Sequence, residues 1–303
     1  MSDEQESPEE LKRKWANRDR VTRAISADGF FRAAVVHNPN TVRTAQDNHA
    51  LDPMSALILA RALTGATLMA SFLKGEERVM LQATGDGVLS SVYAEALQVG
   101  EVRGYVVRNP TPNTDRQSPL GEGLIKVQRI LYGKYEPVTG IVELRKGDVT
   151  SDLGYYLTQS EQIPSAFVID VAFDEHDRIR QSVGLLIQAM PGARPEDIFR
   201  VYDTLDYLDR LTEFADKRYA PDEILRQVLP GDITIASSSP VDFFCRCSHD
   251  RFKAMLLTLG LDEIRSMESD GQNELVCQYC ATKYYLSAED FKEIIEKLLV
   301  KRN

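Results

Sequence analysis

Short apolar runs alternate with polar residues over roughly the first 190 positions, and a helical period replaces this pattern afterwards. Runs rich in Val, Ile, Tyr and Phe that end at Gly, Pro, Asn or Asp are typical of strands. They predict strands at residues 30–36, 78–83, 88–94, 102–107, 124–130, 135–144, 166–173 and 181–190. Two helices are predicted among them, at residues 54–73 and from residue 151 onward. The pattern favours an α+β fold with a core domain, residues 21–192, of mainly antiparallel sheet and packed helices.

The helix predicted at residues 54–73 follows Asp52-Pro53, a capping residue and then proline at the first helical position. It is apolar on nearly every face, so we expect it to be buried in the main core. The tetrapeptide Thr84-Gly85-Asp86-Gly87 joins two predicted strands and is interpreted as a hairpin turn. A phosphate-binding loop would need a helix after it, so no bound nucleotide is expected.

Residues 193–240 follow a Pro- and Gly-rich break and are predicted to form a helical linker. Apolar residues recur there every three or four positions between charged ones, at Ile198, Val201, Leu205, Leu208 and Leu211. Short amphipathic helices are marginal alone in water, so a neighbour must cover this apolar stripe. The segment is either an ordinary helical linker or a metastable one that stays docked only while its neighbours are folded.

All four cysteines lie near the end of the sequence in two close pairs, Cys245-Arg246-Cys247 and Cys277-Gln278-Tyr279-Cys280, with 29 residues between the pairs. Sulfurs two or three residues apart can reach one metal ion, and two such pairs complete the tetrahedral four-cysteine site that zinc favours. We therefore predict one zinc ion in a small C-terminal domain, residues 241–303, whose few large apolar residues need such a staple. The alternative is two local disulfides.

The residues around the four cysteines also bear on the site. His249 is expected to stay outside it, because four sulfur ligands are already available. Four thiolates and one Zn²⁺ carry a net charge of about −2. Four nearby cations would partly offset this charge: Arg246, Arg251, Lys253 and Lys283.

Charge and composition narrow the function further. The net charge of −10 over 303 residues disfavours a nucleic-acid partner, because phosphate binding needs a basic surface. No apolar run of 18 residues occurs, so no membrane partner is expected. Residues 1–20 are charged and lack an apolar signal segment, and are interpreted as a disordered extension. Cysteines confined to one metal-type cluster fit a reducing compartment, so a cytoplasmic protein is expected. No catalytic constellation is recognisable, so an enzyme is not expected.

The cysteine spacing resembles that of the thirty-three-kilodalton heat-shock protein family of redox-regulated chaperones. Further motifs of this sequence support the resemblance: Phe244-Cys245-Arg246-Cys247-Ser248, Leu257-Thr258-Leu259-Gly260, Val276 to Cys280 followed by Tyr284, Gly85-Asp86-Gly87, Ser160-Glu161-Gln162-Ile163-Pro164-Ser165 and Gln188-Ala189-Met190-Pro191-Gly192. One departure is Val88, where the family usually has proline. The resemblance covers residues 21–303.

The resemblance implies an ATP-independent holdase that binds unfolding client proteins during oxidative stress. The reduced, zinc-bound form would be inactive. Oxidation would form the disulfides Cys245–Cys247 and Cys277–Cys280, release zinc and unfold the linker, and the active form would be a homodimer. Local disulfides cannot replace the cross-link that zinc provides between the two pairs. The unfolded linker would then expose its apolar stripe, which makes the following residues candidates for client binding: Ile198, Val201, Leu205, Leu208 and Leu211.

Two other functions compete with the holdase. A zinc-ribbon interaction module would use the metal only as a structural staple, and its zinc would survive mild peroxide. A thiol-disulfide oxidoreductase would use Cys277-Gln278-Tyr279-Cys280, but such a motif usually opens a helix beside a βαβ unit that this sequence does not predict. Turnover of a disulfide substrate would identify that enzyme.

Overall fold

The computed structural model describes residues 18–208 and 210–301. The chain divides into two compact units, Met1–Phe244 and Cys245–Asn303. Most of the charged extension predicted at residues 1–20 lies outside the described residues. Asp19 and Arg20 belong to the folded first unit, because Arg20 begins a strand and the buried Asp19 carboxylate accepts a hydrogen bond from Asn40 Nδ2 at 2.9 Å.

The first unit contains two β-sheets. The five-stranded sheet consists of β1 (Arg20–Ser26), β2 (Phe31–His37), β8 (Ser165–Phe173), β9 (Ile179–Ala189) and β10 (Ile233–Pro240), with neighbours in the order β10-β1-β2-β9-β8. The six-stranded sheet consists of β3 (Arg78–Gly85), β4 (Leu89–Leu97), β5 (Glu101–Arg108), β6 (Gly123–Ile130), β7 (Val138–Glu143) and β11 (Asp242–Phe243), in the order β11-β5-β4-β3-β6-β7. Every pair of neighbours is antiparallel except β11 and β5. The predicted α+β class with mainly antiparallel sheet is confirmed.

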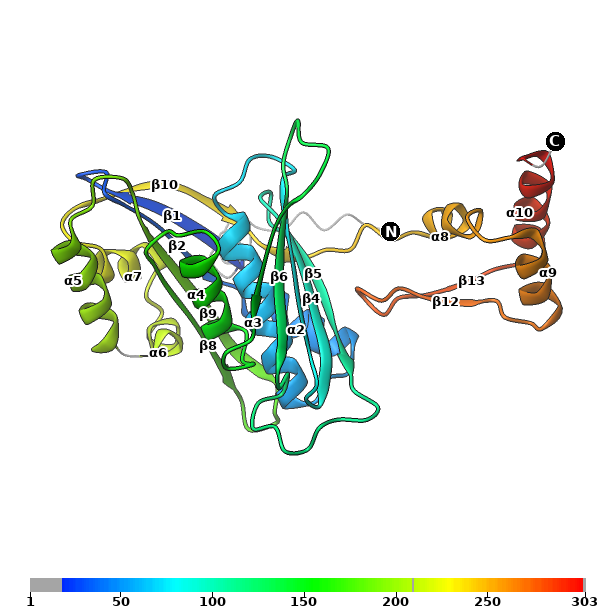
Figure 1. Ribbon diagram of the computed structural model, residues 1–303, viewed down its shortest axis with the longest axis horizontal. Helices are drawn as coiled ribbons and strands as arrows, with labels where there is room; N and C mark the ends of the chain where they lie inside the picture. Colours follow the sequence, from blue (N-terminus) through cyan, green and yellow to red (C-terminus); the bar gives the residue numbers. More distant parts are fainter. Residues whose placement is uncertain (1–17, 209, 302–303) are drawn as a thin grey trace, which may run out of the picture. The chain divides into compact units, whose positions relative to one another are not determined.

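Three helices, α2 (Pro39–Asn48), α3 (Pro53–Ala70) and α4 (Thr150–Gln159), lie between the two sheets (Figure 1). Helix α3 begins where the sequence predicted, because the Asp52 side chain accepts a hydrogen bond from Ser55 N at 3.2 Å. Fourteen of its 18 residues are buried. It is the one described helix long and apolar enough to span a membrane, but 78% of it is buried inside the fold, which is the situation of a core helix. The prediction of a buried core helix is confirmed.

The close packing of α3 depends on a glycine in the facing strand. A Cβ atom on Gly184 of β9 would lie 2.6 Å from Thr64 Cγ2 and 2.9 Å from Leu68 Cδ1. Any larger residue would push the helix away from the sheet, so glycine sets the distance between these two layers.

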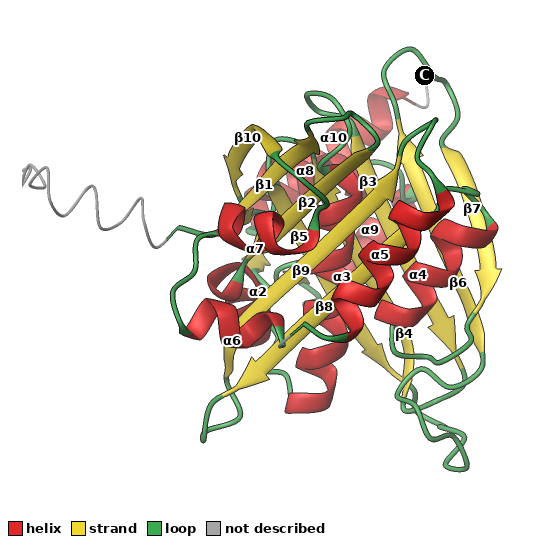
Figure 2. Ribbon diagram, turned by 90° about the vertical axis from the view of Figure 1, so that its left-hand side faces the viewer, coloured by secondary structure: helices red, strands yellow, loops and turns green. Residues whose placement is uncertain are grey.

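Helices α5 (Pro195–Asp206), α6 (Leu211–Asp216) and α7 (Pro221–Val228) cover the other face of the five-stranded sheet (Figure 2). The sheet and these helices share one apolar cluster, in which the largest fully buried side chain is Phe31 of β2. The Asp170 carboxylate of β8 holds the start of α6. It accepts hydrogen bonds from Thr212 N at 3.1 Å and Thr212 Oγ1 at 2.6 Å. It also forms an ion pair with Arg210 Nη2 at 2.8 Å.

Three elements differ from the sequence predictions. Residues 233–240, expected within a helical linker, form strand β10 beside β1. The pairing with β1 satisfies their backbone groups, although most of their side chains are exposed. Helix α2 and strand β1 were not predicted; α2 begins at Pro39, directly after strand β2. The apolar residues that recur at helical spacing from Ile198 to Phe214 do not form one helix. They are divided between α5 and α6.

The second unit is small. It contains α8 (His249–Leu256), α9 (Leu261–Ser269), β12 (Glu274–Val276), β13 (Lys283–Tyr285) and α10 (Ala288–Lys301). Its described core consists of seven buried apolar residues, Leu256, Leu261, Ile264, Leu286, Phe291, Ile294 and Leu298. Such a small core supplies little stability by itself.

The Gly-Asp-Gly turn between β3 and β4 anchors the long loop that leads into β6. The Asp86 carboxylate accepts hydrogen bonds from Arg116 Nη2 at 2.7 Å and Glu122 N at 2.9 Å. The loop backbone approaches so closely that a Cβ on Gly87 would lie 2.4 Å from Pro119 O. The hydrogen bonds from Arg116 lower the pKa of Asp86 to about 2 from an ordinary value of 3.8. The turn is a structural clamp, as the hairpin interpretation requires.

We predict that this clamp weakens in acid. A carboxylate whose pKa is lower in the folded protein stabilises the fold above its ordinary pKa, and this contribution disappears as the pH falls from about 4 toward about 2. Asp86→Asn should therefore speed amide hydrogen exchange in residues 109–122 at pH 7, and the difference from wild type should vanish near pH 2. Asp115→Asn, in the same exposed loop, is the control and should match wild type. An equal exchange rate in Asp86→Asn at pH 7 would contradict the clamp.

Candidate metal centre

The two cysteine pairs come from two different local structures. Cys245 and Cys247 lie between β11 and α8, just before Ser248, whose hydroxyl caps α8 by accepting from Arg251 N at 3.2 Å. Cys277 and Cys280 lie in the turn between β12 and β13. This turn is closed by hydrogen bonds from Cys277 N to Thr282 O at 2.9 Å and from Ala281 N to Cys277 O at 2.8 Å.

The four sulfur atoms converge, all within 4.8 Å of one another. Cys245 Sγ lies 3.7 Å from Cys277 Sγ, and Cys247 Sγ lies 3.4 Å from Cys280 Sγ. Zinc–sulfur bonds of about 2.3 Å in a tetrahedron place neighbouring sulfurs about 3.8 Å apart. The donor set and its spacing therefore fit one tetrahedral metal ion.

Local contacts divide the thiols by acidity. Burial raises the pKa of Cys277 to about 12. At Cys280 burial also acts to raise the pKa, but hydrogen bonds with Thr282 and the neighbouring thiols outweigh it and lower the pKa to about 7. A partly buried group of four thiols therefore resists full deprotonation on its own, and a divalent cation would compensate the negative charge of four thiolates.

Two hydroxyl groups contact the sulfurs, and the sequence analysis did not assign either a role. Tyr284 Oη lies 3.1 Å from Cys247 Sγ, and Thr282 Oγ1 lies 3.2 Å from Cys280 Sγ. The hydrogen bond to Cys247 is the main reason that the pKa of Tyr284 rises to about 12. Both residues follow Cys280 within four positions, so hydroxyl side chains just after a CxxC motif are the signal that would have indicated them.

Two of the cations expected to offset the charge of the sulfurs form ion pairs with carboxylates. Lys253 pairs with Asp290 at 2.8 Å and Lys283 pairs with Glu274 at 2.9 Å, so these two lysines are engaged with carboxylates. That the four cations partly offset the charge of the sulfurs stays a prediction. His249 Nε2 lies 3.4 Å from the Asp290 carboxylate, and its ring is not among the clustered ligand atoms.

The five client-binding candidates lie in the first unit, and all contact one apolar cluster. Val201 and Leu211 are 4% and 2% exposed, and the three others are partly buried against the same cluster: Ile198, Leu205 and Leu208. Their role in binding clients stays a prediction. In this conformation the five-stranded sheet covers much of the apolar stripe.

Known proteins with this architecture share both units. Residues 19–287 match the family model described as Hsp33 protein. The 33 kDa chaperonin of Desulforamulus reducens is 33% identical over 289 residues, which cover 92% of this chain and 98% of that protein. The 33 kDa chaperonin of Bacillus subtilis is 33% identical over 284 residues, 90% of this chain and 97% of that protein.

A solved structure extends the similarity to the fold. The crystal structure of the 33 kDa chaperonin from Thermotoga maritima matches 94% of this chain and 100% of that chain with a TM-score of 0.83 and 27% identity. The family model covers residues 19–287, which include the four cysteines, and the two relatives cover nine-tenths of the chain or more. The chain therefore belongs to the Hsp33 family of chaperones.

Proposed function

We propose that this protein is a redox-regulated, ATP-independent holdase, not an enzyme, that works in the cytoplasm and prevents aggregation of unfolding proteins under oxidative stress. Membership of a chaperone family supports the binding of unfolded clients. The observation that carries the redox part is the convergence of all four cysteines of the chain in one small unit.

The same convergence supports zinc as the staple of the reduced state. Bound Zn²⁺ supplies charge compensation for four thiolates and a cross-link between the two cysteine pairs. Structural zinc contributes on the order of 10–16 kcal/mol of binding free energy that is also folding free energy. The seven-residue apolar core of the second unit cannot replace a contribution of that size. Domain 241–303 is thus proposed as the redox switch.

Oxidation removes the ligands. A peroxide oxidises one thiolate to a sulfenic acid and is itself reduced to hydroxide, and a second thiol then attacks the sulfenic sulfur to form a disulfide and water. Cys245–Cys247 and Cys277–Cys280 are the proposed bonds. Sulfurs of different pairs also lie close together, at 3.7 Å for Cys245 and Cys277 and 3.4 Å for Cys247 and Cys280. Disulfides across the pairs would keep the two segments joined, whereas local disulfides separate them, so the proposal depends on the local pairing.

Release of the linker, residues 193–240, is the proposed output. Its helices α5, α6 and α7 are short and hold their apolar stripe against the five-stranded sheet. Strands β10 and β11 are the covalent connection from these helices to Cys245, which follows β11 by two residues. Loss of the folded second unit removes a constraint on this connection. Undocking would expose the stripe and the sheet face beneath it for clients and for a second copy in a homodimer.

We expect peroxide with mild heating to release one Zn²⁺ per chain and to produce holdase activity at the same time, both reversed by a reductant. A chromogenic chelator measures Zn²⁺, light scattering of citrate synthase measures aggregation, and peptide mapping identifies the disulfides. The variant with all four cysteines replaced by serine is the control for oxidation of the seven methionines, and peroxide should not change its activity. Retained zinc, or zinc release without holdase activity, would leave the cysteines as a structural staple only.

Tyr284→Phe should weaken zinc binding by about 10–100-fold, the usual effect of removing a hydrogen bond to a metal ligand. The lost contact is the 3.1 Å hydrogen bond between Tyr284 Oη and Cys247 Sγ. Competition with a chelator measures the affinity. Tyr285→Phe is the matched control, because the neighbouring hydroxyl donates to Glu274 at 2.8 Å and not to a sulfur. Equal affinities of the two variants would show that the Tyr284 hydroxyl does not support the site.

Asp170→Asn should loosen the linker in the reduced protein. Hydrogen bonds from Thr212 and Arg210 outweigh the effect of burial and lower the pKa of Asp170. Their weakening should cost about 1–2 kcal/mol locally, which corresponds to about tenfold faster amide exchange in α6. Holdase activity should appear at lower peroxide concentrations. Asp203→Asn, exposed on α5, is the control. Faster exchange without a lower peroxide threshold would separate linker docking from regulation.

A further inference from the structure

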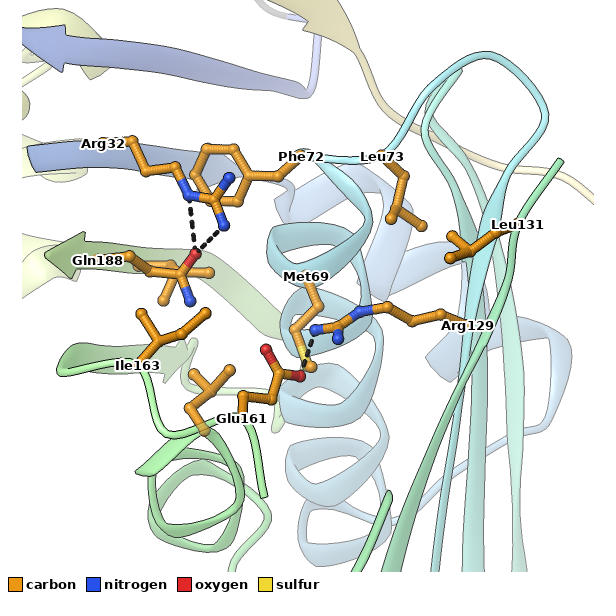
Figure 3. Close-up of a pocket in the computed structure, with 11 residues that line it drawn as sticks. Arg32, Met69, Phe72, Leu73, Arg129, Leu131, Glu161, Ile163 and Gln188 are labelled. Atoms are coloured by element: carbon orange, nitrogen blue, oxygen red, sulfur yellow. Dashed lines mark hydrogen bonds and ion pairs between the residues drawn. The ribbon is translucent and has the colours of Figure 1, made fainter. Parts of the chain in front are cut away.

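A cavity of about 210 Å³ lies in the first unit, beyond the C-terminal end of α3 (Figure 3). Its polar side chains come from four separate parts of the chain. Arg32 belongs to β2 and Gln188 to β9 of one sheet, Arg129 belongs to β6 of the other sheet, and Glu161 follows α4. Convergence of charged groups from both sheets on one cavity is the arrangement of a binding site rather than of an ordinary packing gap.

One charge in this cavity has no opposite partner. Arg129 Nη2 forms an ion pair with Glu161. Arg32 donates from Nε and Nη2 to the neutral oxygen Gln188 Oε1, at 3.0 Å and 2.8 Å. No ion pair of Arg32 occurs within residues 18–208 and 210–301. Together the two arginines and the one carboxylate leave a net charge of +1 that faces the cavity.

The guanidinium of Arg32 is partly buried and has contacts that orient it. It lies over the Phe72 ring, 4.4 Å from the ring centre. The Gln188 amide that it contacts is buried, and Gln188 Nε2 donates to Ser165 Oγ at 3.2 Å, which fixes the acceptor oxygen toward Arg32. Burial and the nearby charge of Arg129 lower the pKa of Arg32, and the charge of Glu161 offsets only part of this effect; an arginine remains protonated at neutral pH. A half-buried cation with only neutral hydrogen-bond partners favours an anion beside it.

The remaining walls are apolar. Met69, Leu131, Leu157 and Ile163 are among the apolar residues that line it. The volume exceeds the cavity of about 150 Å³ that binds benzene. It is smaller than the pockets of about 300 Å³ and more that hold drug-sized ligands. The cavity thus accommodates one short apolar chain or ring.

We propose that this cavity binds a small amphipathic monocarboxylate, with its carboxylate on Arg32 and its apolar body against Met69, Leu131 and Leu157. The Glu161 carboxylate, which is only 9% exposed, repels a second negative group and restricts the site to monoanions. Two sources supply this chemistry: a free medium-chain carboxylic acid, or the last residue of a peptide with an apolar side chain and a free carboxylate. The cavity belongs to the first unit and the four cysteines to the second, so this proposal does not depend on the redox proposal.

The test uses the reduced, zinc-loaded full chain with ¹³C-labelled methionine methyl groups. Octanoate is the probe, and the Met69 methyl resonance, assigned with Met69→Leu, reports on the cavity. We expect a saturable shift of this resonance at millimolar octanoate, and at least about tenfold weaker binding of neutral octanol and of the dicarboxylate octanedioate, a difference of about 1.4 kcal/mol. N-acetyl-leucine and its amide test the peptide source in the same way. No Met69 shift, or equal binding of octanol, would overturn the proposal.

Variants localise the charge. Arg32→Met removes the positive charge but leaves a side chain of similar length, and it should weaken octanoate binding at least tenfold. Arg32→Lys keeps the charge and should retain part of the affinity. Arg178→Met is the matched control, because Arg178 is exposed and pairs with Asp47 at 2.7 Å, and it should bind octanoate as wild type does. Unchanged affinity in Arg32→Met would refute the assignment. If Arg32→Met does not fold, the comparison of octanoate with octanol on the wild-type protein decides alone.

Discussion

The enclosure of α3 by two sheets is the constraint on which the first unit depends. Because the helix is apolar on nearly every face, it needs a cover on every side, and the two sheets provide it. This arrangement uses one face of the five-stranded sheet and leaves its other apolar face for α5, α6 and α7. It also sets the sheets apart at the C-terminal end of the helix, where the cavity with Arg32 and Arg129 lies. The linker and the cavity are thus two results of one packing solution.

The two units contrast in how they are stabilised. The first unit has large apolar clusters on both faces of its five-stranded sheet, whereas the second has seven buried apolar residues and four converging sulfurs. In the proposed switch, oxidation acts on the cysteine sulfurs of the second unit. A chain that stores most of its stability in apolar packing and a small part in an oxidisable cluster can lose the second without losing the first. This uneven distribution is what the proposed switch requires.

The sequence predicted elements whose signal is local. Helix α3 has its own cap and apolar faces, the β3–β4 hairpin has its glycine turn, and the spacing of Cys245, Cys247, Cys277 and Cys280 indicated their cluster. Elements that depend on distant partners were missed. The Ser-rich strand β10 is stabilised by β1, where Thr22 and Ser238 pair across 216 positions. The hydroxyl of Tyr284 reaches Cys247 only through the β12–β13 turn. The polar residues of the cavity come from four segments, and no local sequence pattern indicates that they meet.

The pairing of β1 with β10 also bears on how the chain is made. Synthesis proceeds from the N-terminus, and domains fold as they emerge. Strand β2 follows β1 directly and can pair with one edge of it early in synthesis. The other edge of β1 has no partner strand until residues 233–240 leave the ribosome. Open strand edges attract other chains. During translation β1 therefore presents an open edge until β10 pairs with it, and β10, whose side chains are mostly exposed, then becomes the edge strand of the finished sheet.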